Sequence, residues 1–304
     1  KRLLIAEKPS AVLIYGYYQK EHWILRLLCQ MLHIPLLFVG ESFADRSRGL
    51  RGWVREPLLR FFFRGISQFI AIGKKTFDYY ENKGIHPKRI SQARYCTETK
   101  LMHLSSARAE KARAQLRKEL GIPPTAFVLL FVGRLFDRKR PQDILALHEK
   151  FAENHNFHTV VVGNGELEGE LRRQSAKTPR LHLVGFQNQN RTRDFYYASD
   201  LLFVPSEYET WGLVVNEAAA TGLPSLVTET CGVAGDLVIH DRTGFVFPVG
   251  DLRKAKSIVH SLFENRGFLK STGRRVQQKV LAEYRTDHFA ESILNAYDRI
   301  SSVP

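Results

Sequence analysis

Residues 200–228 read DLLFVPSEYETWGLVVNEAAATGLPSLVT, and the stretch has the pattern of a strand, a helix and a second strand. The apolar runs DLLFVPS and LPSLVT flank the helical segment LVVNEAAAT. We expect Trp211 and Gly212 to form the turn into the helix, and Gly222 with Pro224 to end it. Because two strands joined through a helix run parallel, the stretch predicts part of a parallel sheet covered by helices on both faces.

The same alternation continues along the chain. Nearly continuous apolar runs, typical of strands buried on both faces, occur at 11–17, 34–40, 67–73, 126–133, 158–163 and 181–185. Helical patterns fill the intervals, including 22–32, 109–121 and 140–153. This order predicts an α/β protein built on parallel sheets. A length of 304 residues favours two domains, with a boundary near residue 100, in the polar stretch 97–106.

Composition argues against several classes of protein. The chain is 44% apolar and 25% charged, and it has no apolar run of about 18 residues. Its first residues lack the pattern of a signal peptide. The three cysteines, Cys29, Cys96 and Cys231, are far apart and fit reduced thiols rather than a disulfide framework or a zinc site. We therefore expect a cytoplasmic protein without a bound metal or cofactor.

The positive charge is concentrated in the first third of the chain. The net charge is +10 in residues 1–100 and +4 in residues 101–304. Nucleic acid, an anionic membrane surface and a phosphate-bearing substrate are all suitable partners for such a surface.

Polar and glycine residues follow the expected strands of the second half, where doubly wound sheets bind ligands. Arg134 and Lys139 follow the run at 126–133, and Gly163 and Gly165 follow the run at 158–163. Two cations on such a loop can hold a diphosphate, and the glycines allow a ligand to approach the backbone. Each signal is weak alone, since a loop arginine is commonly a solvated surface residue.

Glu209 and Glu217 stand out because the segment around them is otherwise apolar. The amides of Gly212, Leu213 and Val214 should point out of a helix N-terminus, which suits a phosphate or a sugar hydroxyl. Two acceptors beside an anion site fit a nucleotide sugar. The alternative is structural: Glu209 caps the helix and Glu217 pairs with a neighbouring arginine.

Five motifs carry a resemblance to a known family. The segments GRLFDRK, VVVGNGELEGEL, LHLVGF, the stretch quoted first, and DRTGFVFPVGD stand in the same order as in the donor half of family-four retaining glycosyltransferases. The similarity spans about residues 127–251. It implies a GT-B fold, with two Rossmann-like domains of parallel sheet that face a cleft.

The resemblance also implies roles for residues. Glu209 would contact hydroxyls of the transferred sugar, Glu217 the ribose, and Arg134 with Lys139 the diphosphate, without a metal. Glu209, Arg134 and Lys139 are then the catalytic candidates. The implied donor-binding set is Gly133, Arg134, Lys139, Val184, Gly185, Phe186, Glu209, Trp211, Gly212, Leu213, Val214 and Glu217.

The first third resembles the acceptor half of the same family only in part. The family's opening strand and glycine-rich loop have no counterpart, so residues 1–100 are expected to form an incomplete acceptor domain. Residues 101–286 would be the donor domain, and residues 287–304 a helix crossing back towards the first. Gly40-Glu41-Ser42 stands where many members have a histidine. Glu41 is a candidate acceptor-side residue, or a cap for the following segment.

The segment 45–70 combines arginines with apolar residues. As a helix kinked at Pro57, it would place Leu50, Trp53, Val54, Leu58, Phe61 and Phe62 on one face, packed on the first sheet. The arginines would form its solvated face, or bind an anionic membrane on the cytoplasmic side. These arginines are Arg48, Arg51, Arg55, Arg60 and Arg64.

The sequence thus predicts a retaining glycosyltransferase that moves a sugar, foremost from a UDP-sugar, to a glycan or lipid-linked glycan. Polysaccharide, lipopolysaccharide or glycolipid synthesis would be its setting. A sugar-nucleotide epimerase of the same fold and a nucleotide-sugar-binding fragment without activity are the alternatives. Nucleic-acid binding is disfavoured, because no helix-turn-helix, zinc spacing or aromatic RNA-binding motif occurs.

Overall fold

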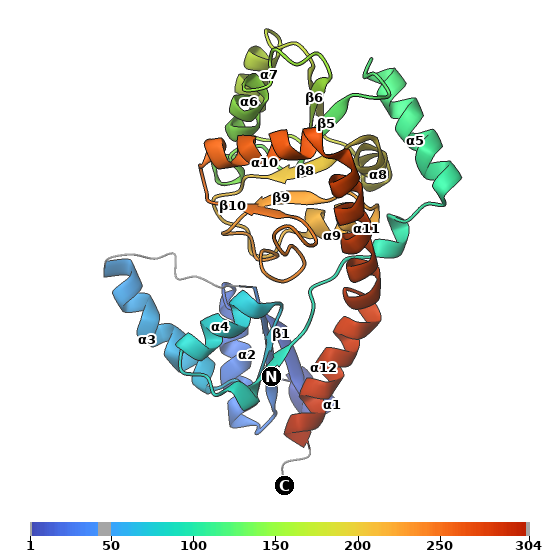
Figure 1. Ribbon diagram of the computed structural model, residues 1–304. Helices are drawn as coiled ribbons and strands as arrows, with labels where there is room; N and C mark the ends of the chain where they lie inside the picture. The colour runs from blue at the N-terminus through green and yellow to red at the C-terminus, as the bar shows by residue number, and fades with distance from the viewer. Residues whose placement is uncertain (1, 42–49, 302–304) are drawn as a thin grey trace. The chain divides into compact units, whose positions relative to one another are not determined.

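The computed structural model describes residues 2–41 and 50–301, and the chain divides into two compact units (Figure 1). The first unit is Lys1–Tyr95 with Thr286–Pro304, and the second unit is Cys96–Arg285. Each unit contains one sheet, and all sheet pairs between the named strands of the described residues are parallel. The predicted α/β class is confirmed.

The sheet of the first unit has the order β1-β2-β3-β4. Its strands are β1 Val12–Tyr15, β2 Leu36–Gly40, β3 Gln68–Ala71 and β4 Ile90–Gln92. Every residue of β2 and β3 is buried, which explains their continuous apolar sequence. The sequence analysis did not predict β4, because three residues are too few to show a pattern.

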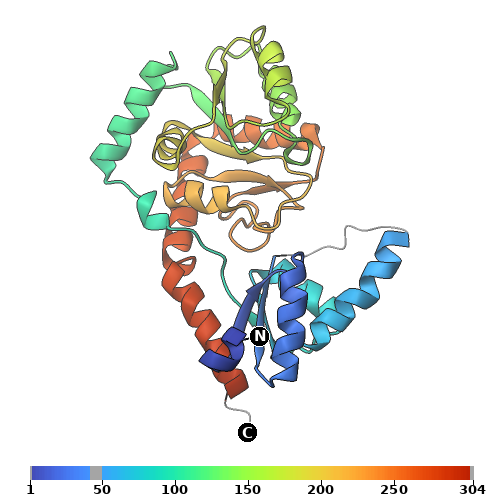
Figure 2. The ribbon, with the colours of Figure 1, turned by 180° about the vertical axis from the view of Figure 1, so that it is seen from behind.

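Helices cover both faces of this first sheet. In the two views α2 and α4 lie on one side of the strands and α12 on the other (Figures 1 and 2). The helices of the unit are α1 Arg2–Glu7, α2 Lys20–Met31, α3 Leu50–Arg64, α4 Lys74–Asn82 and α12 Thr286–Ser301. The last of these, α12, packs on β3 and β4, so the end of the chain belongs to the first unit.

The predicted apolar face of α3 is partly wrong. The helix runs through Pro57, and Phe62 is buried as expected, but Leu58 and Phe61 are about half exposed. Leu59 and Phe63 are buried instead. The side chains of residues 50–54 lie outside the described part of the structure, as does Arg48. The register of the helix therefore turns two large apolar side chains to solvent beside its arginines.

The sheet of the second unit has the order β10-β9-β8-β5-β6-β7. Its strands are β5 Phe127–Val132, β6 Phe157–Val162, β7 Leu181–Gly185, β8 Leu201–Val204, β9 Ser225–Thr228 and β10 Phe245–Phe247. Five of the six were predicted. The short edge strand β10 was predicted only as part of a family motif.

Two layers of helices enclose this second sheet. Apolar residues of α6, α7 and α10 join the core on one face, and α8, α9 and α11 lie on the other (Figure 1). The helices are α5 Ser106–Glu119, α6 Gln142–Glu149, α7 Glu168–Ser175, α8 Gln189–Ala198, α9 Leu213–Ala220, α10 Leu252–Glu264 and α11 Arg266–Glu283.

Within the described ranges, no helix combines the length and the hydropathy that a bilayer-spanning segment needs.

Candidate functional site

The candidate site lies at the point in the second sheet where the strand order reverses. Strands β5 and β8 are neighbours, yet the chain continues from β5 outward to β6 and β7, and from β8 outward to β9 and β10. In open parallel sheets, ligands bind beyond the carboxyl ends of the strands at such a reversal. Arg134 and Lys139 follow β5, and Glu209 follows β8, so three predicted residues belong to this crevice.

Glycines let the loops beyond three neighbouring strands approach each other closely. The amide of Gly163 donates to the carbonyl of Gly185, and the amide of Gly133 donates to that of Val162. A Cβ on Gly163 would lie 1.8 Å from the carbonyl oxygen of Gly133, and a Cβ on Gly165 would lie 2.4 Å from that of Leu135. Only glycine fits at these two positions, because the backbone of a neighbouring loop fills the space of a side chain. The predicted approach of a ligand to these glycines stays a prediction.

Lys139 and Glu209 form an ion pair at the centre of the crevice. Their side chains are 19% and 13% exposed, so both charges are largely removed from water. Burial lowers the pKa of Lys139 to about 8, and the nearby charge of Arg138 acts in the same direction. A buried ion pair of this kind is costly unless it has a function or further partners. The sequence did not predict this pairing.

The N-terminus of α9 opens beside Glu209. Gly212 stands before the helix with φ +105°, a conformation that favours glycine, and a Cβ there would lie 3.5 Å from Cγ of Glu209. The N-cap residue is a glycine and has no side chain to cap α9, and the Glu209 carboxylate forms its ion pair with Lys139. The structural alternative in which Glu209 caps α9 stays a prediction. Trp211 anchors the turn, because its ring is buried and its Nε1 donates to Oδ1 of Asn216 at 2.9 Å.

Glu217 lies one turn further along α9 and is bound by a tyrosine. The hydroxyl of Tyr196, on α8, donates to Oε2 of Glu217 at 2.7 Å. Burial raises the pKa of Glu217, and the hydrogen bond from Tyr196 opposes this shift. Its pairing partner is thus a phenol rather than the predicted arginine. No feature of the sequence pointed to Tyr196, whose segment DFYYASD reads only as the end of an amphipathic helix.

The remaining predicted residues lie towards solvent. Phe186 is 70% exposed and Leu213 is 37% exposed. Arg134 is exposed, with its guanidinium carbon 6.0 Å from the centre of the Phe136 ring. Val184 and Val214 are half-buried. The structure thus joins Lys139 to Glu209, while the contacts of Arg134 and Phe186 with a ligand stay predictions.

Glu41 belongs to the other unit and follows β2. It accepts a hydrogen bond from the hydroxyl of Tyr95 at 2.7 Å. The segment after it, which Glu41 was alternatively expected to cap, lies outside the described residues. Its acceptor-side role remains a prediction.

The arrangement in the second unit suits an anionic ligand that carries hydroxyls. It offers a buried cation in Lys139 and an exposed one in Arg134, together with the open N-terminus of α9 for a phosphate. Glu209 and Glu217 provide acceptors for hydroxyls on either side of that N-terminus. Among the described residues, no group of three or more histidine, cysteine or acidic side chains is placed to hold a metal ion.

Known proteins resemble this chain in sequence. The family profile "Glycosyl transferases group 1" matches residues 112–279. N-acetyl-alpha-D-glucosaminyl L-malate synthase of Bacillus anthracis is 26% identical over 190 residues, which cover 61% of this chain and 48% of that protein. UDP-Gal:alpha-D-GlcNAc-diphosphoundecaprenol alpha-1,3-galactosyltransferase of Escherichia coli is 32% identical over 142 residues, covering 44% and 36%. The chain spans about half the length, or less, of the curated relatives it matches.

Solved structures resemble it in fold. HepE of Anabaena, crystallised with UDP, superposes with a TM-score of 0.83 at 18% identity, and the match covers 99% of this chain and 81% of that one. Sucrose-phosphate synthase of Thermosynechococcus elongatus has a TM-score of 0.78 at 19% identity, covering 96% and 74%. The predicted GT-B fold is confirmed.

Proposed function

Because this chain belongs to the glycosyl transferases group 1 family, we propose that it takes part in the transfer of a sugar from a UDP-sugar to a glycan or lipid-linked glycan. The observation that carries this proposal is the buried Lys139–Glu209 pair beside the open N-terminus of α9 at the β5–β8 crevice. The choice of UDP is supported by the UDP and UDP-glucose complexes of HepE. The choice of acceptor is supported by the name of the Escherichia coli relative.

Each part of the crevice has a role in this proposal. Arg134 and Lys139 bind the diphosphate, and Glu217 accepts from the ribose hydroxyls. The base lies against the backbone of residues 184–186. Because a diphosphate competes for Lys139, its arrival releases Glu209 to accept from hydroxyls of the sugar.

Transfer proceeds with retention and without a metal in the proposed reaction. The bond between the anomeric carbon and the diphosphate oxygen breaks while the acceptor oxygen attacks the same face, and the acceptor proton passes to the departing diphosphate. Charge builds up on that diphosphate in the transition state. Lys139, Arg134 and the amides at the start of α9 stabilise it, which is the contribution that a divalent cation makes in other transferases.

The test is release of the nucleotide. The protein is incubated with UDP-glucose, UDP-galactose or UDP-N-acetylglucosamine, with and without a lipid-linked acceptor and with EDTA, and free UDP is measured by mass spectrometry. We expect UDP to appear faster with the acceptor and EDTA to have no effect. Conversion of the sugar without release of UDP would indicate an epimerase, and binding without turnover would indicate an inactive fragment.

A membrane-bound acceptor further implies peripheral binding to an anionic bilayer at its cytoplasmic face, through α3. Exposed Leu58 and Phe61 alternate there with the exposed Arg60 and Arg64. Arg55 instead donates to the hydroxyl of Tyr17 at 2.5 Å, so it contributes less to the outer surface. Basic residues close to anionic lipid contribute on the order of 1 kcal/mol each.

Co-sedimentation with vesicles that contain phosphatidylglycerol tests this surface. Binding should decrease with salt, and Arg60→Glu with Arg64→Glu should reduce it by at least tenfold. The matched control is Arg253→Glu with Lys254→Glu, which reverses two exposed charges on α10. Equal binding by both double variants would count against a membrane role for α3.

A further inference from the structure

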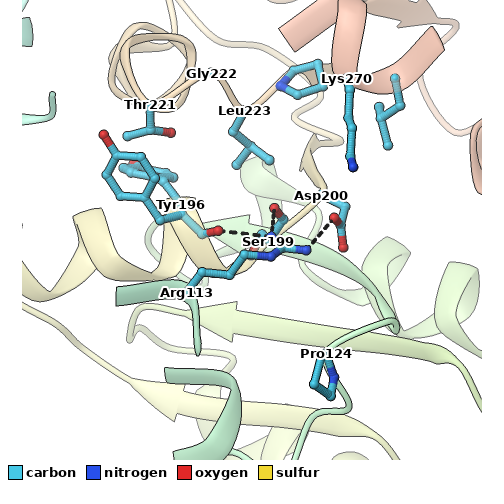
Figure 3. Close-up of a pocket in the computed structure, with 12 residues that line it drawn as sticks. Arg113, Pro124, Tyr196, Ser199, Asp200, Thr221, Gly222, Leu223 and Lys270 are labelled. Carbon is cyan, nitrogen blue, oxygen red and sulfur yellow. Dashed lines mark hydrogen bonds and ion pairs between the residues drawn. The ribbon is translucent and has the colours of Figure 1, made fainter. Parts of the chain in front are cut away.

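A cavity lies at the opposite edge of the second sheet from the candidate site. It has a volume of about 440 Å³ and is lined by residues that come just before β8 and β9, where these strands begin (Figure 3). Ser199 and Asp200 precede β8, and Thr221 with Leu223 precede β9. Its size falls within the range of small-molecule sites. The cavity belongs entirely to the second unit, and neither the family motifs nor the proposed function uses it.

Positive charge is in excess around this cavity. Asp200 accepts from Nη2 of Arg113 at 2.9 Å and from Nη2 of Arg117 at 2.8 Å, and Nη1 of Arg266 lies 3.6 Å from it. One carboxylate therefore faces three guanidinium groups. Lys270 adds a fourth cation at the rim, and in Figure 3 its ammonium group points towards Asp200. A ligand that balances this charge must be an anion.

Arg113 and Lys270 still have N–H groups available to bind an anion in this cavity. The Nη1 of Arg113 donates to the carbonyls of Tyr197 and Ser199, and Nη2 donates to Asp200. These bonds use three of its five N–H groups. Lys270 is exposed, and within residues 2–41 and 50–301 no ion pair or hydrogen bond of its ammonium group was found. Arg113 is thus held rigidly while it faces the cavity, and Lys270 supplies a mobile charge.

We propose that this cavity is an effector site for a small phosphorylated sugar. Phosphate is the anion that suits a fixed guanidinium beside a lysine. The walls away from the charges are apolar, formed by Leu223, Leu269 and Pro124, and can pack against one face of a sugar ring. The free lone pairs of Asp200 Oδ1 and the Thr221 hydroxyl can accept from ring hydroxyls.

The helix α9 connects this effector site to the donor site. Its N-cap, Gly212, lies beside Glu209, and the two residues that follow its last turn, Thr221 and Gly222, line the cavity. Tyr196 forms a second connection, because it lines the cavity and its hydroxyl binds Glu217. A ligand that immobilises the end of α9 would hold Glu217 in its binding position. The effector should therefore tighten UDP binding, and this step rests on the proposed function.

Calorimetric titration tests the site itself. Glucose 1-phosphate should bind to protein already saturated with UDP, inorganic phosphate should bind more weakly, and glucose should not bind. Lys270→Glu should weaken the binding of glucose 1-phosphate at least tenfold. Lys256→Glu, an equal charge reversal on the exposed face of α10, should leave that affinity unchanged. Displacement of glucose 1-phosphate by UDP, or equal affinity for both variants, would overturn the proposal.

The coupling is tested by the affinity for UDP. Saturating glucose 1-phosphate should increase the affinity for UDP about fivefold or more, which is the lower end of ordinary allosteric coupling. Tyr196→Phe should bind both ligands and lose this tightening. An unchanged affinity for UDP in the wild-type protein would refute the effector role. If UDP does not bind at all, the proposed function fails, and the titration with Lys270→Glu still decides whether the cavity is a site.

Discussion

Replacement of Lys139 by methionine separates recognition of the diphosphate from recognition of the nucleoside. The lysine is largely buried and contacts Glu209, and methionine keeps most of its length without the charge. A hydrogen bond to a charged group contributes about 1.5–3 kcal/mol. Loss of one such contact lowers the affinity for UDP by about 10- to 150-fold. Uridine, which has no phosphate, should bind Lys139→Met as it binds the wild-type protein.

A second change controls for the carboxylate that Lys139→Met leaves behind. An unpaired Glu209 repels the diphosphate and destabilises the empty protein, because a buried charge without its partner is costly. Lys139→Met with Glu209→Gln should therefore recover part of both losses. Calorimetry with UDP and uridine measures the affinities, and thermal unfolding measures the stability. Equal losses for UDP and uridine, or no loss for UDP, would refute the assignment of Lys139 to the phosphates.

Three further outcomes follow from particular contacts. Glu217→Gln keeps the acceptor for Tyr196 but removes the charge, so the binding free energy of UDP should weaken by about 1–2 kcal/mol while the melting temperature changes little. An affinity for UDP equal to that of the wild-type protein in calorimetry would remove Glu217 from the site. Burial lowers the pKa of His158 to about 4, so the unfolded chain takes up a proton first as the pH falls below about 6.5. Up to about 3 kcal/mol of the free energy of unfolding should then be lost between pH 6.5 and 4, and denaturant titrations should show a smaller loss for His158→Leu; equal losses would contradict the burial argument. Gly163→Ala should lower the free energy of unfolding by more than about 2 kcal/mol. At Gly235 φ is also positive, but no atom lies within 4 Å of the added Cβ, so Gly235→Ala should lower it by only about 1 kcal/mol. Similar melting temperatures for the two variants would contradict the close approach of the Gly163 and Gly133 loops.

The long buried strands could be predicted because both of their faces are covered. Strand β5 contains only apolar residues and β6 ends in three valines, and the glycines that follow these two strands mark close backbone contacts. By contrast, β4 and β10 have three residues each, which is too short for a period to appear. In α3 the periodicity was present, but it could not fix which apolar residues face the sheet, since Leu58 and Phe61 turned outward.

The candidate site was predictable in part. Its location followed from the rule that ligands bind beyond the carboxyl ends of strands, and its residue set followed from the family motifs. The contacts among these residues did not follow, because they depend on segments that are distant in sequence. Lys139 follows β5 and pairs with Glu209, which follows β8. Tyr196 lies on α8 and donates to Glu217, which lies on α9. The effector cavity has no motif at all, since α5, α8 and α11 each contribute to it.

Photolabelling with 5-azido-UDP-glucose tests the central claim most directly, because the reactive group on the base reports where the nucleotide lies. The labelled protein is digested, and the modified peptide is identified by mass spectrometry. The label should fall on residues 184–186, at the carboxyl end of β7, and excess UDP should prevent it. Labelling of the peptide that holds residues 221–224, or labelling that UDP does not prevent, would contradict a nucleotide-sugar site at the carboxyl edge of the second sheet.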